Sequence, residues 1–353
     1  MKRILLTGGG TAGHVTPNIA IIPKLKEKYE LYYIGSYKGI EKDLISETGI
    51  TYKAISTGKL RRYFSMQNFA DFFRVIRGTV QAFFYIKKVK PKLVFSKGGF
   101  VAVPVVLAAK LCNVPVVCHE SDLSPGIATK ISAKFANKIC CTFEECAKLF
   151  ASKGVHTGTP LRESLFNGSA EKARKKYNLD NKPVLVIIGG SQGAAAVNNA
   201  IQDILDSLTQ KYNIIHLCGE GKVNKDLLNV KSYIQIEYLK DELADVFALA
   251  DMIISRAGSN SIEELHALEK PMLLIPLPRT SVSRGDQIQN AKNYEQKGLA
   301  HVLLQEDISK ETLMNAIDKL YIERETLIKN LKNNPAKQGR ELVIEIIDQN
   351  VAK

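Results

Sequence analysis

The stretch ILLTGGGTAGH, residues 4–14, joins a short apolar run to a glycine-rich turn that opens a predicted helix. Backbone N–H groups at a helix N-terminus, together with the helix dipole, favour a bound phosphate. The spacing formally matches G-x-G-x-x-G, the fingerprint of dinucleotide-binding domains. Such a domain needs an acidic residue about 20 positions on, for the ribose hydroxyls. The predicted second strand ends in Ile34-Gly35-Ser36-Tyr37, without a carboxylate, which argues against an NAD-dependent dehydrogenase.

A second stretch of the same plan, VLVIIGGSQGA, covers residues 184–194. Short β-branched runs alternate with amphipathic segments along the whole chain, which is typical of βα units and a parallel sheet. The predicted strands are Ile4–Thr7, Leu31–Ile34, Leu93–Ser96, Val114–Cys118 and Lys138–Cys141, then Val184–Ile188, Ile214–Leu217, Ile234–Glu237, Met252–Ser255, Met272–Ile275 and His301–Leu304. The chain is therefore predicted to be α/β, with two Rossmann-like, doubly wound parallel-sheet domains.

The boundary between the two domains is expected after Thr157-Gly158-Thr159-Pro160, where glycine and proline interrupt strand and helix. We expect an N-terminal domain over residues 1–162 and a C-terminal domain over 163–335. The helical segment after Pro335, about residues 336–353, has no strand after it. We expect this segment to pack back on the first domain.

Charge is distributed unevenly along the 353 residues. The net charge of +13 resolves into +15 over residues 1–162 and −2 over the rest. This asymmetry indicates that the first domain faces an anionic partner, although a merely basic surface remains an alternative. Nucleic acid is disfavoured because no recognition module accompanies the charge. The six cysteines form no C-x-x-C pair, and no signal peptide or uninterrupted apolar span is found, so a cytoplasmic location is expected.

A third candidate site lies at residues 255–264, SRAGSNSIEE, where a predicted strand ends in Arg256 and a hydroxyl-rich helix start follows. Acidic residues in a first helical turn also favour the dipole, so capping alone explains one of the two glutamates. A carboxylate there can alternatively bind ribose hydroxyls while the N–H groups and Arg256 face phosphates. Residues 284–290, RGDQIQN, offer a polar helix start suited to sugar hydroxyls.

Seven motifs in this order resemble the MurG glycosyltransferases of glycosyltransferase family 28, which complete the lipid-linked precursor of peptidoglycan. They span nearly the whole chain: residues 9–14, KGGF at 97–100, HESD at 119–122, GTPLR at 158–162, GGSQG at 189–193, the segment 256–264, and Asp286-Gln287. The resemblance implies a GT-B architecture, with two domains facing across a cleft. It also implies a UDP-sugar in the second domain and the acceptor diphosphate near the first.

The resemblance further implies residue roles. Around the UDP-sugar donor it places Arg162, Ser191, Gly193, Leu239, Arg256, Ser259, Asn260, Ser261, Glu264 and Gln287, with Leu239 flanking the uracil through backbone groups. From the first domain it brings Thr11, Ala12, Gly13, His14 and Asp122. Many members of the family read H-E-Q-N where this chain has HESD, and Gly where it has Ala12. Asp122 thus adds a negative charge, which is suited to a sugar hydroxyl or to a base.

The implied reaction is an inverting transfer of N-acetylglucosamine from UDP-N-acetylglucosamine to the C4 hydroxyl of undecaprenyl-diphosphate-linked N-acetylmuramyl-pentapeptide, lipid I to lipid II. His14 is the candidate base; a structural histidine is the alternative. No D-x-D motif occurs, so no metal and no cofactor are expected. A UDP-N-acetylglucosamine 2-epimerase of the same fold is the runner-up, which would need no lipid.

A helical stripe between residues 60 and 88 is the candidate membrane surface. The stripe consists of Met66, Phe69, Phe72, Phe73, Ile76, Val80, Phe83 and Phe84, with basic residues on its flanks. Such a stripe fits a crossover helix packed on its sheet, and it equally fits an interfacial helix on an anionic leaflet. In the second case Tyr63 and Phe64 are the expected aromatic anchors, and the protein is peripheral at the cytoplasmic face of the membrane.

Overall fold

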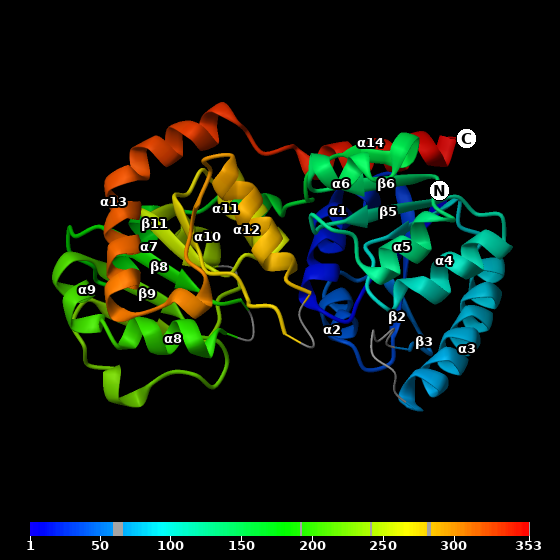
Figure 1. The fold of residues 1–353 in the computed structure, drawn as a ribbon. Coiled ribbons are helices and arrows are strands. Elements are labelled where there is room, and N and C mark those ends of the chain that lie inside the picture. Colours follow the sequence, from blue (N-terminus) through cyan, green and yellow to red (C-terminus); the bar gives the residue numbers. More distant parts are fainter. Residues whose placement is uncertain (59–65, 191–192, 241, 281–283, 353) are drawn as a thin grey trace. The chain divides into compact units, whose positions relative to one another are not determined.

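The computed structural model describes residues 1–58, 66–190, 193–240, 242–280 and 284–352. The chain divides into two compact units (Figure 1): a first unit of Met1–Arg162 with Lys337–Lys353, and a second unit of Glu163–Ala336. Each unit is built on one parallel sheet with helices on its faces. The candidate residues Ser191, Tyr63 and Phe64 lie outside the described residues.

The first unit contains a seven-stranded sheet over its described residues, in the order β3-β2-β1-β4-β5-β6-β7. Its strands are β1 Lys2–Thr7, β2 Tyr29–Ser36, β3 Thr51–Ile55, β4 Leu93–Ser96, β5 Val116–Glu120, β6 Lys138–Cys141 and β7 Gly154–His156. Every pairing is parallel. Strands β4 and β5 are buried along their whole length and β1 is buried from Ile4 on, because helices cover both faces of the sheet.

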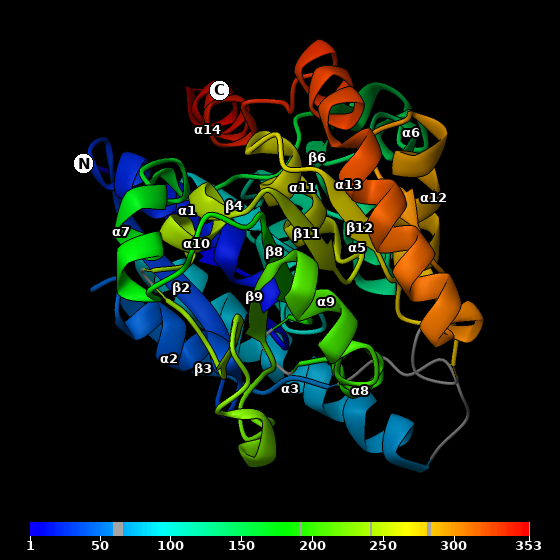
Figure 2. The ribbon, with the colours of Figure 1, turned by 90° about the vertical axis from the view of Figure 1, so that its left-hand side faces the viewer.

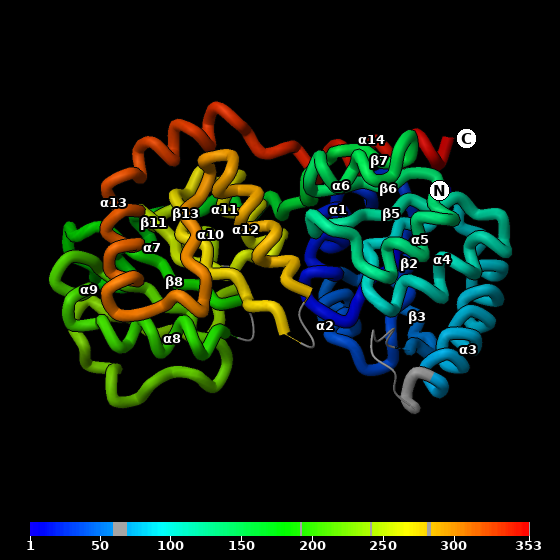
Figure 3. The backbone as a smooth tube through the Cα atoms, viewed as in Figure 1, coloured from blue at the N-terminus to red at the C-terminus, as the bar shows by residue number. Residues whose placement is uncertain are grey.

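Apart from the C-terminal α14, the helices of the first unit lie in the connections between these strands. They are η1 Ala12–His14, α1 Thr16–Lys26, α2 Ile40–Ser46, α3 Met66–Val89, α4 Ala102–Leu111, α5 Ile127–Ala133, α6 Glu144–Lys148, η2 Ala151–Lys153 and, from the other end of the chain, α14 Gly339–Ala352. Helix α14 lies beside α1 (Figure 3). Its Val343 and Ile347 are fully buried in one core with Ile4 and Leu6 of β1. Asp348 accepts hydrogen bonds from Lys28 Nζ and Tyr29 Oη, both at 2.7 Å.

The second unit contains a six-stranded sheet over its described residues, in the order β10-β9-β8-β11-β12-β13. Its strands are β8 Val184–Ile188, β9 Asn213–Leu217, β10 Tyr233–Ile236, β11 Met252–Ser255, β12 Met272–Leu274 and β13 His301–Val302. Its helices are η3 Glu163–Phe166, α7 Ala170–Lys176, α8 Ala195–Gln202, α9 Leu205–Lys211, η4 Lys225–Leu227, α10 Leu243–Leu249, α11 Ser259–Ala267, α12 Asp286–Gln296, η5 Gln305–Asp307 and α13 Lys310–Asn333. Helices α9 and α13 lie side by side (Figure 2) and share one apolar core.

The predicted fold class is confirmed, and all eleven predicted strands are present within two residues of their predicted bounds. Two edge strands, β3 and β7, were not predicted. In β3 only Ile55 is fully buried, and Thr51 and Lys53 are exposed, so the segment carries no apolar run. Strand β7 has three residues, all half-buried. Both strands are defined by their hydrogen bonds to a neighbouring strand, because neither has an apolar pattern of its own.

Helix α3 shows one buried and one exposed side. Its small residues Gly78 and Ala82 are buried on the side that meets α4. A Cβ at Gly78 would lie 2.0 Å from the carbonyl oxygen of Ser56, which explains the glycine. Six residues of the predicted stripe, by contrast, are exposed: Phe69, Phe72, Phe73, Ile76, Val80 and Phe84. Most of the stripe therefore does not pack on the sheet.

The buried position of α14 leads to a stability prediction. Replacing Ile347 by alanine leaves a cavity in the first unit's core and should lower the free energy of unfolding by about 2–5 kcal/mol. The measurement is urea denaturation followed by circular dichroism. The control is Gln349→Ala on the exposed side of the same helix, which should change stability by less than about 0.5 kcal/mol. Equal stabilities of the two variants would show that α14 does not pack in this core.

Candidate functional site

In both units the strand order reverses between two central neighbours. Strands β1 and β4 pair in the first unit with Thr7 opposite Ser96, and β8 and β11 pair in the second with Ile188 opposite Ser255. The connections that follow the two strands of each pair run toward opposite edges of the sheet. In open parallel sheets, ligands bind at such a point, outside the carboxyl ends of the strands. The two predicted glycine turns follow β1 and β8 directly, so each lies at the reversal point of its own sheet.

In the first unit, His14 lies at the end of the β1 turn. Its Nδ1 is 2.9 Å from Thr11 Oγ1, and the imidazole is half-buried. The ring lies against the turn after β4: a Cβ on Gly99 would be 3.4 Å from His14 Cγ and 2.2 Å from the Gly9 carbonyl oxygen. Two glycine turns from neighbouring strands therefore pack against each other, and Thr11, Ala12 and Gly13 lie in the same turn as His14.

Lys97, the first residue after β4, is fully buried beneath these turns. Its Nζ donates a 2.5 Å hydrogen bond to Ser121 Oγ. Burial lowers the pKa of Lys97 to about 8, and the carboxylates of Glu120 and Asp122 oppose that shift. The extra negative charge of Asp122 is thus matched by a buried cation nearby. No role of Lys97 could be predicted from the sequence, because a lysine after a strand normally lies in solvent.

The segment after β5 is fixed by backbone hydrogen bonds. Glu120 accepts from the amides of Asp122 and Gly126, both at 3.0 Å. His119 Nε2 lies 3.0 Å from the Gly158 carbonyl oxygen. Burial, and secondarily the charge of Lys97, lowers the pKa of His119 well below its usual value, so this histidine is neutral and structural. Asp122 is half-buried at the edge that carries Thr11–His14.

Glu41 is a further carboxylate at this edge, and it was not predicted from the sequence. It belongs to the first turn of α2 and is fully buried. It accepts hydrogen bonds from the amide of Gly10 at 3.1 Å and from the amide of Ser36 at 2.9 Å. The second strand does lack a carboxylate at its end, but α2 supplies one five residues later. The acidic residue in a first helical turn was the only signal in the sequence, and dipole capping also explains it.

In the second unit, the turn after β8 lies next to the start of the loop after β11. The amide of Arg256 donates to the Ile188 carbonyl oxygen at 3.3 Å, and the amide of Gly193 donates to Gly190 at 2.9 Å. Gly193 has a φ of +65°, and a Cβ on it would lie 2.0 Å from the Cys218 carbonyl oxygen. Glycine is therefore required there by both conformation and space.

The guanidinium of Arg256 is held within its own unit. Its Nη1 donates to the carbonyl oxygens of Ile275 at 3.1 Å and Pro276 at 3.2 Å, and its Nη2 donates to Gln305 Oε1 at 2.6 Å. Burial lowers the pKa of Arg256, but a guanidinium stays charged in proteins. The side chain supplies a fixed positive charge at the carboxyl edge of β11.

The other predicted donor residues of the second unit lie at the same edge of its sheet. Ser259, Asn260, Ser261 and Glu264 occupy the first two turns of α11, with Gly258 as N-cap. Leu239 lies three residues after the end of β10 and is buried. Just before it, the Glu237 carbonyl oxygen accepts a hydrogen bond from the Gly219 amide. Gln287 is the second residue of α12, and its Oε1 accepts from the Leu277 amide at 3.0 Å. Arg162 ends the first unit, and its buried Nε has no hydrogen-bond partner among the described residues.

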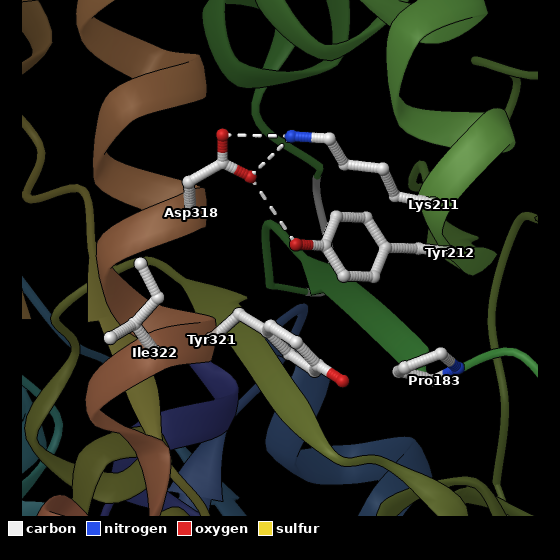
Figure 4. A pocket seen from close by; sticks show the side chains of 6 residues that line it. All are labelled: Pro183, Lys211, Tyr212, Asp318, Tyr321 and Ile322. Carbon is white, nitrogen blue, oxygen red and sulfur yellow. Dashed lines mark hydrogen bonds and ion pairs between the residues drawn. The ribbon is translucent and has the colours of Figure 1, made fainter.

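A hollow of about 420 Å³ lies elsewhere in the second unit (Figure 4). Its lining residues are Pro183, Lys211, Tyr212, Asp318, Tyr321 and Ile322. Asp318 bridges Lys211 Nζ at 2.8 Å and Tyr212 Oη at 3.4 Å. Pro183 and Tyr212 immediately precede β8 and β9, so the hollow is at the amino ends of the strands. It is therefore at the opposite edge from the glycine turn and is not part of this site.

Comparisons with known proteins identify the family of both domains. Residues 4–141 match the glycosyltransferase family 28 N-terminal domain, and residues 184–346 match the glycosyltransferase family 28 C-terminal domain. Among solved structures, Acinetobacter baumannii MurG has a TM-score of 0.78 at 24% identity, covering 99% of this chain and 100% of its own. A putative UDP-N-acetylglucosamine 2-epimerase from Listeria monocytogenes has a TM-score of 0.67 at 12% identity, covering 98% and 96%. These two similarities show a shared fold.

Sequence identity separates the two families that share this fold. A relative from Clostridium tetani is the UDP-N-acetylglucosamine–N-acetylmuramyl-(pentapeptide) pyrophosphoryl-undecaprenol N-acetylglucosamine transferase. It is 52% identical over 351 residues, which are 99% of this chain and 98% of the relative. With both domain families matched and an alignment over almost the full length, the chain belongs to glycosyltransferase family 28, among the MurG glycosyltransferases.

Proposed function

We propose that this protein transfers N-acetylglucosamine from UDP-N-acetylglucosamine to the C4 hydroxyl of an undecaprenyl-diphosphate-linked N-acetylmuramyl-pentapeptide, converting lipid I to lipid II in peptidoglycan synthesis. The observation that carries the proposal is the full-length identity to the Clostridium tetani transferase. The glycine turns of the two units supply the chemistry, because each offers helix-start amides at the reversal point of a parallel sheet.

The second unit is proposed to bind the UDP-sugar. The fixed charge of Arg256 and the amides after β8 are suited to the diphosphate, whose negative charge grows as UDP departs. Arg162, whose buried Nε has no hydrogen-bond partner in the part of the chain that the structure describes, is a second candidate for that charge. Ser259, Asn260, Ser261 and Glu264 would bind hydroxyl groups, Gln287 the sugar, and backbone groups near Leu239 the uracil. Gly193 completes the turn around the diphosphate, with Ser191 as an expected donor outside the described residues.

The first unit is proposed to bind the acceptor, with His14 as the general base. The Thr11 contact on Nδ1 decides which ring nitrogen can act. If Nδ1–H donates to Thr11 Oγ1, the lone pair of Nε2 is left to accept the proton of the attacking hydroxyl. Thr11, Ala12 and Gly13 then contact the acceptor diphosphate, and Asp122 contacts a sugar hydroxyl. Transfer is a single displacement at C1, with inversion and with UDP as leaving group.

Helix α3 is proposed to hold the protein on the cytoplasmic face of the membrane as a peripheral enzyme. Phe69 is 72% exposed and Phe84 is 67% exposed, whereas apolar residues on a crossover helix are usually buried. Phe69, Phe72 and Phe73 form a contiguous cluster, with ring centroids 5.0 and 5.7 Å apart. Arg74, Arg77, Lys87 and Lys88 are exposed on the same helix. None of the helices in the described part of the chain could span a membrane.

The alternative function is that of a UDP-N-acetylglucosamine 2-epimerase. Such an enzyme would not need an exposed aromatic cluster, and it would form a different product. The test is UDP release from UDP-N-acetylglucosamine, with and without a synthetic undecaprenyl-diphosphate-linked muramyl-pentapeptide. We expect release that depends on the acceptor, with equal amounts of UDP and of disaccharide-lipid product. Acceptor-independent formation of UDP-N-acetylmannosamine would instead identify an epimerase.

Replacement of His14 tests the proposed base. His14→Ala should lower kcat by about 10²- to 10⁴-fold with the donor dissociation constant nearly unchanged, because general base catalysis contributes that much to the rate. The control is His301→Asn in the second unit, where His301 pairs with Glu323 at 3.0 Å away from the turns; it should keep turnover. Near-normal turnover of His14→Ala would rule out the assignment.

Vesicle binding tests the role of α3. The double variant Phe72→Ser, Phe73→Ser should weaken binding to vesicles containing anionic phosphatidylglycerol by about 10-fold or more, because each buried phenylalanine contributes about 1.5–3 kcal/mol. The control is Ile322→Ser, another exposed apolar residue, on α13 of the second unit. Sedimentation with vesicles measures both. If the double variant sediments as the native protein does, α3 is not the membrane surface.

A further inference from the structure

The buried carboxylate of Glu41 is joined to the glycine turn after β1 by its own hydrogen bonds. Oε2 accepts from the Gly10 amide at 3.1 Å, and Oε1 accepts from both the Ser36 amide at 2.9 Å and Ser36 Oγ at 2.5 Å. Within the described part of the chain Glu41 forms no ion pair, and its side chain is fully buried. A buried carboxylate without a cation is costly unless its oxygens are hydrogen-bonded. The three hydrogen bonds to Glu41 offset that cost, and one of them comes from the glycine turn.

Space around the carboxylate ties its position to that of the turn. A Cβ on Gly9 would lie 2.5 Å from Glu41 Cδ, and a Cβ on Gly39 would lie 2.1 Å from Glu41 Oε2. On Gly10, a Cβ would lie 2.4 Å from the ring of Phe100. The turn is thus packed between the Glu41 carboxylate and an aromatic ring, and a shift of the carboxylate must move the turn as well.

Hydrogen bonds fix both ends of the segment Gly8–Gly10. The hydroxyl of Tyr33 donates to the Gly8 carbonyl oxygen at 2.7 Å, and Glu41 holds the Gly10 amide. Gly10 has a φ of +90°, a conformation that glycine adopts readily and an L-residue rarely. The next residues along the chain are Thr11–His14. The orientation of the proposed acceptor-binding residues is therefore set from beneath the turn.

We propose that Glu41 is a positioning residue for acceptor binding, which holds the Gly8–Gly10 segment so that Thr11–His14 meets the acceptor diphosphate and the attacking hydroxyl. The inference rests on the proposed function, in which this turn binds the acceptor. Glu41 itself touches no substrate, because it is buried beneath the turn. Loss of its hydrogen bond to Gly10 affects the acceptor and leaves the UDP-sugar site of the second unit intact.

Glu41→Gln is the direct test. A carboxamide has one acceptor oxygen, and its NH₂ group must face one of the amides that now donate, so the variant keeps the size of the side chain and loses a hydrogen bond. The KM for the undecaprenyl-diphosphate-linked acceptor should rise by about 10- to 100-fold, as small displacements of binding groups do. The KM for UDP-N-acetylglucosamine should change by less than about 2-fold. Glu30→Gln, an exposed carboxylate of β2 paired with Arg3, is the matched control and should change neither constant.

Gly39→Ala reaches the same contact from the other side. Gly39 has a φ of −88°, which alanine adopts readily, so the added methyl group acts through its clash with the Glu41 carboxylate. We expect the same acceptor-selective rise in KM. This second variant decides the matter if Glu41→Gln does not fold. Glu41→Asp should also raise the KM for the acceptor, because its shorter side chain cannot reach Gly10 and Ser36 together.

The outcomes separate this inference from the function on which it rests. An acceptor-selective rise in KM in a folded variant supports it. Unchanged KM values, or equal rises for both substrates, in folded Glu41→Gln or Gly39→Ala would overturn it while acceptor-dependent transfer by the native protein upholds the proposed function. Absence of acceptor-dependent transfer in the native protein would overturn the proposed function, and this inference with it.

Discussion

The parallel pairing of the first and fourth strands within each sheet is the constraint on which the candidate sites depend. Thr7 lies opposite Ser96 in one unit and Ile188 opposite Ser255 in the other. Parallel pairing brings the carboxyl ends of both strands to one edge of the sheet. Because the strand order reverses there, the connections that follow the two strands run in opposite directions and leave space for a ligand between them. The glycine turns can approach these ends closely because they lack side chains, as the Gly99 and Gly193 contacts show.

Much of this arrangement could be predicted from the sequence, because the residues that produce it are local. A β-branched run followed by glycines predicts a strand, a turn and a helix start in one continuous segment, and both turns are where the sequence placed them. The edge strands β3 and β7 could not be predicted, since their residues are partly exposed and their pairing depends on a neighbour. The same holds for the exposed side of α3, since a helical stripe does not specify what covers it.

The positions of Glu41 and Lys97 at the candidate site could not be predicted from the sequence. Each is a charged residue that would ordinarily be placed in solvent, and each is fully buried beneath the glycine turns of the first unit. Their neighbours come from distant parts of the chain: Gly10 for Glu41 and Ser121 for Lys97. Only the folded sheet brings these pairs together. The Lys97 cation also accounts for Asp122, because a carboxylate near a buried ammonium group is better tolerated than an isolated one.

The central claim is that the turn after β8 and the loop after β11 bind the donor, whereas the turn after β1 binds the acceptor. Amide hydrogen exchange in the presence of each substrate tests it most directly. UDP-N-acetylglucosamine should slow exchange at residues 189–193 and 256–264 and leave residues 8–14 unchanged, and the undecaprenyl-diphosphate acceptor should do the reverse. Protection of residues 8–14 by the nucleotide sugar alone would contradict the account.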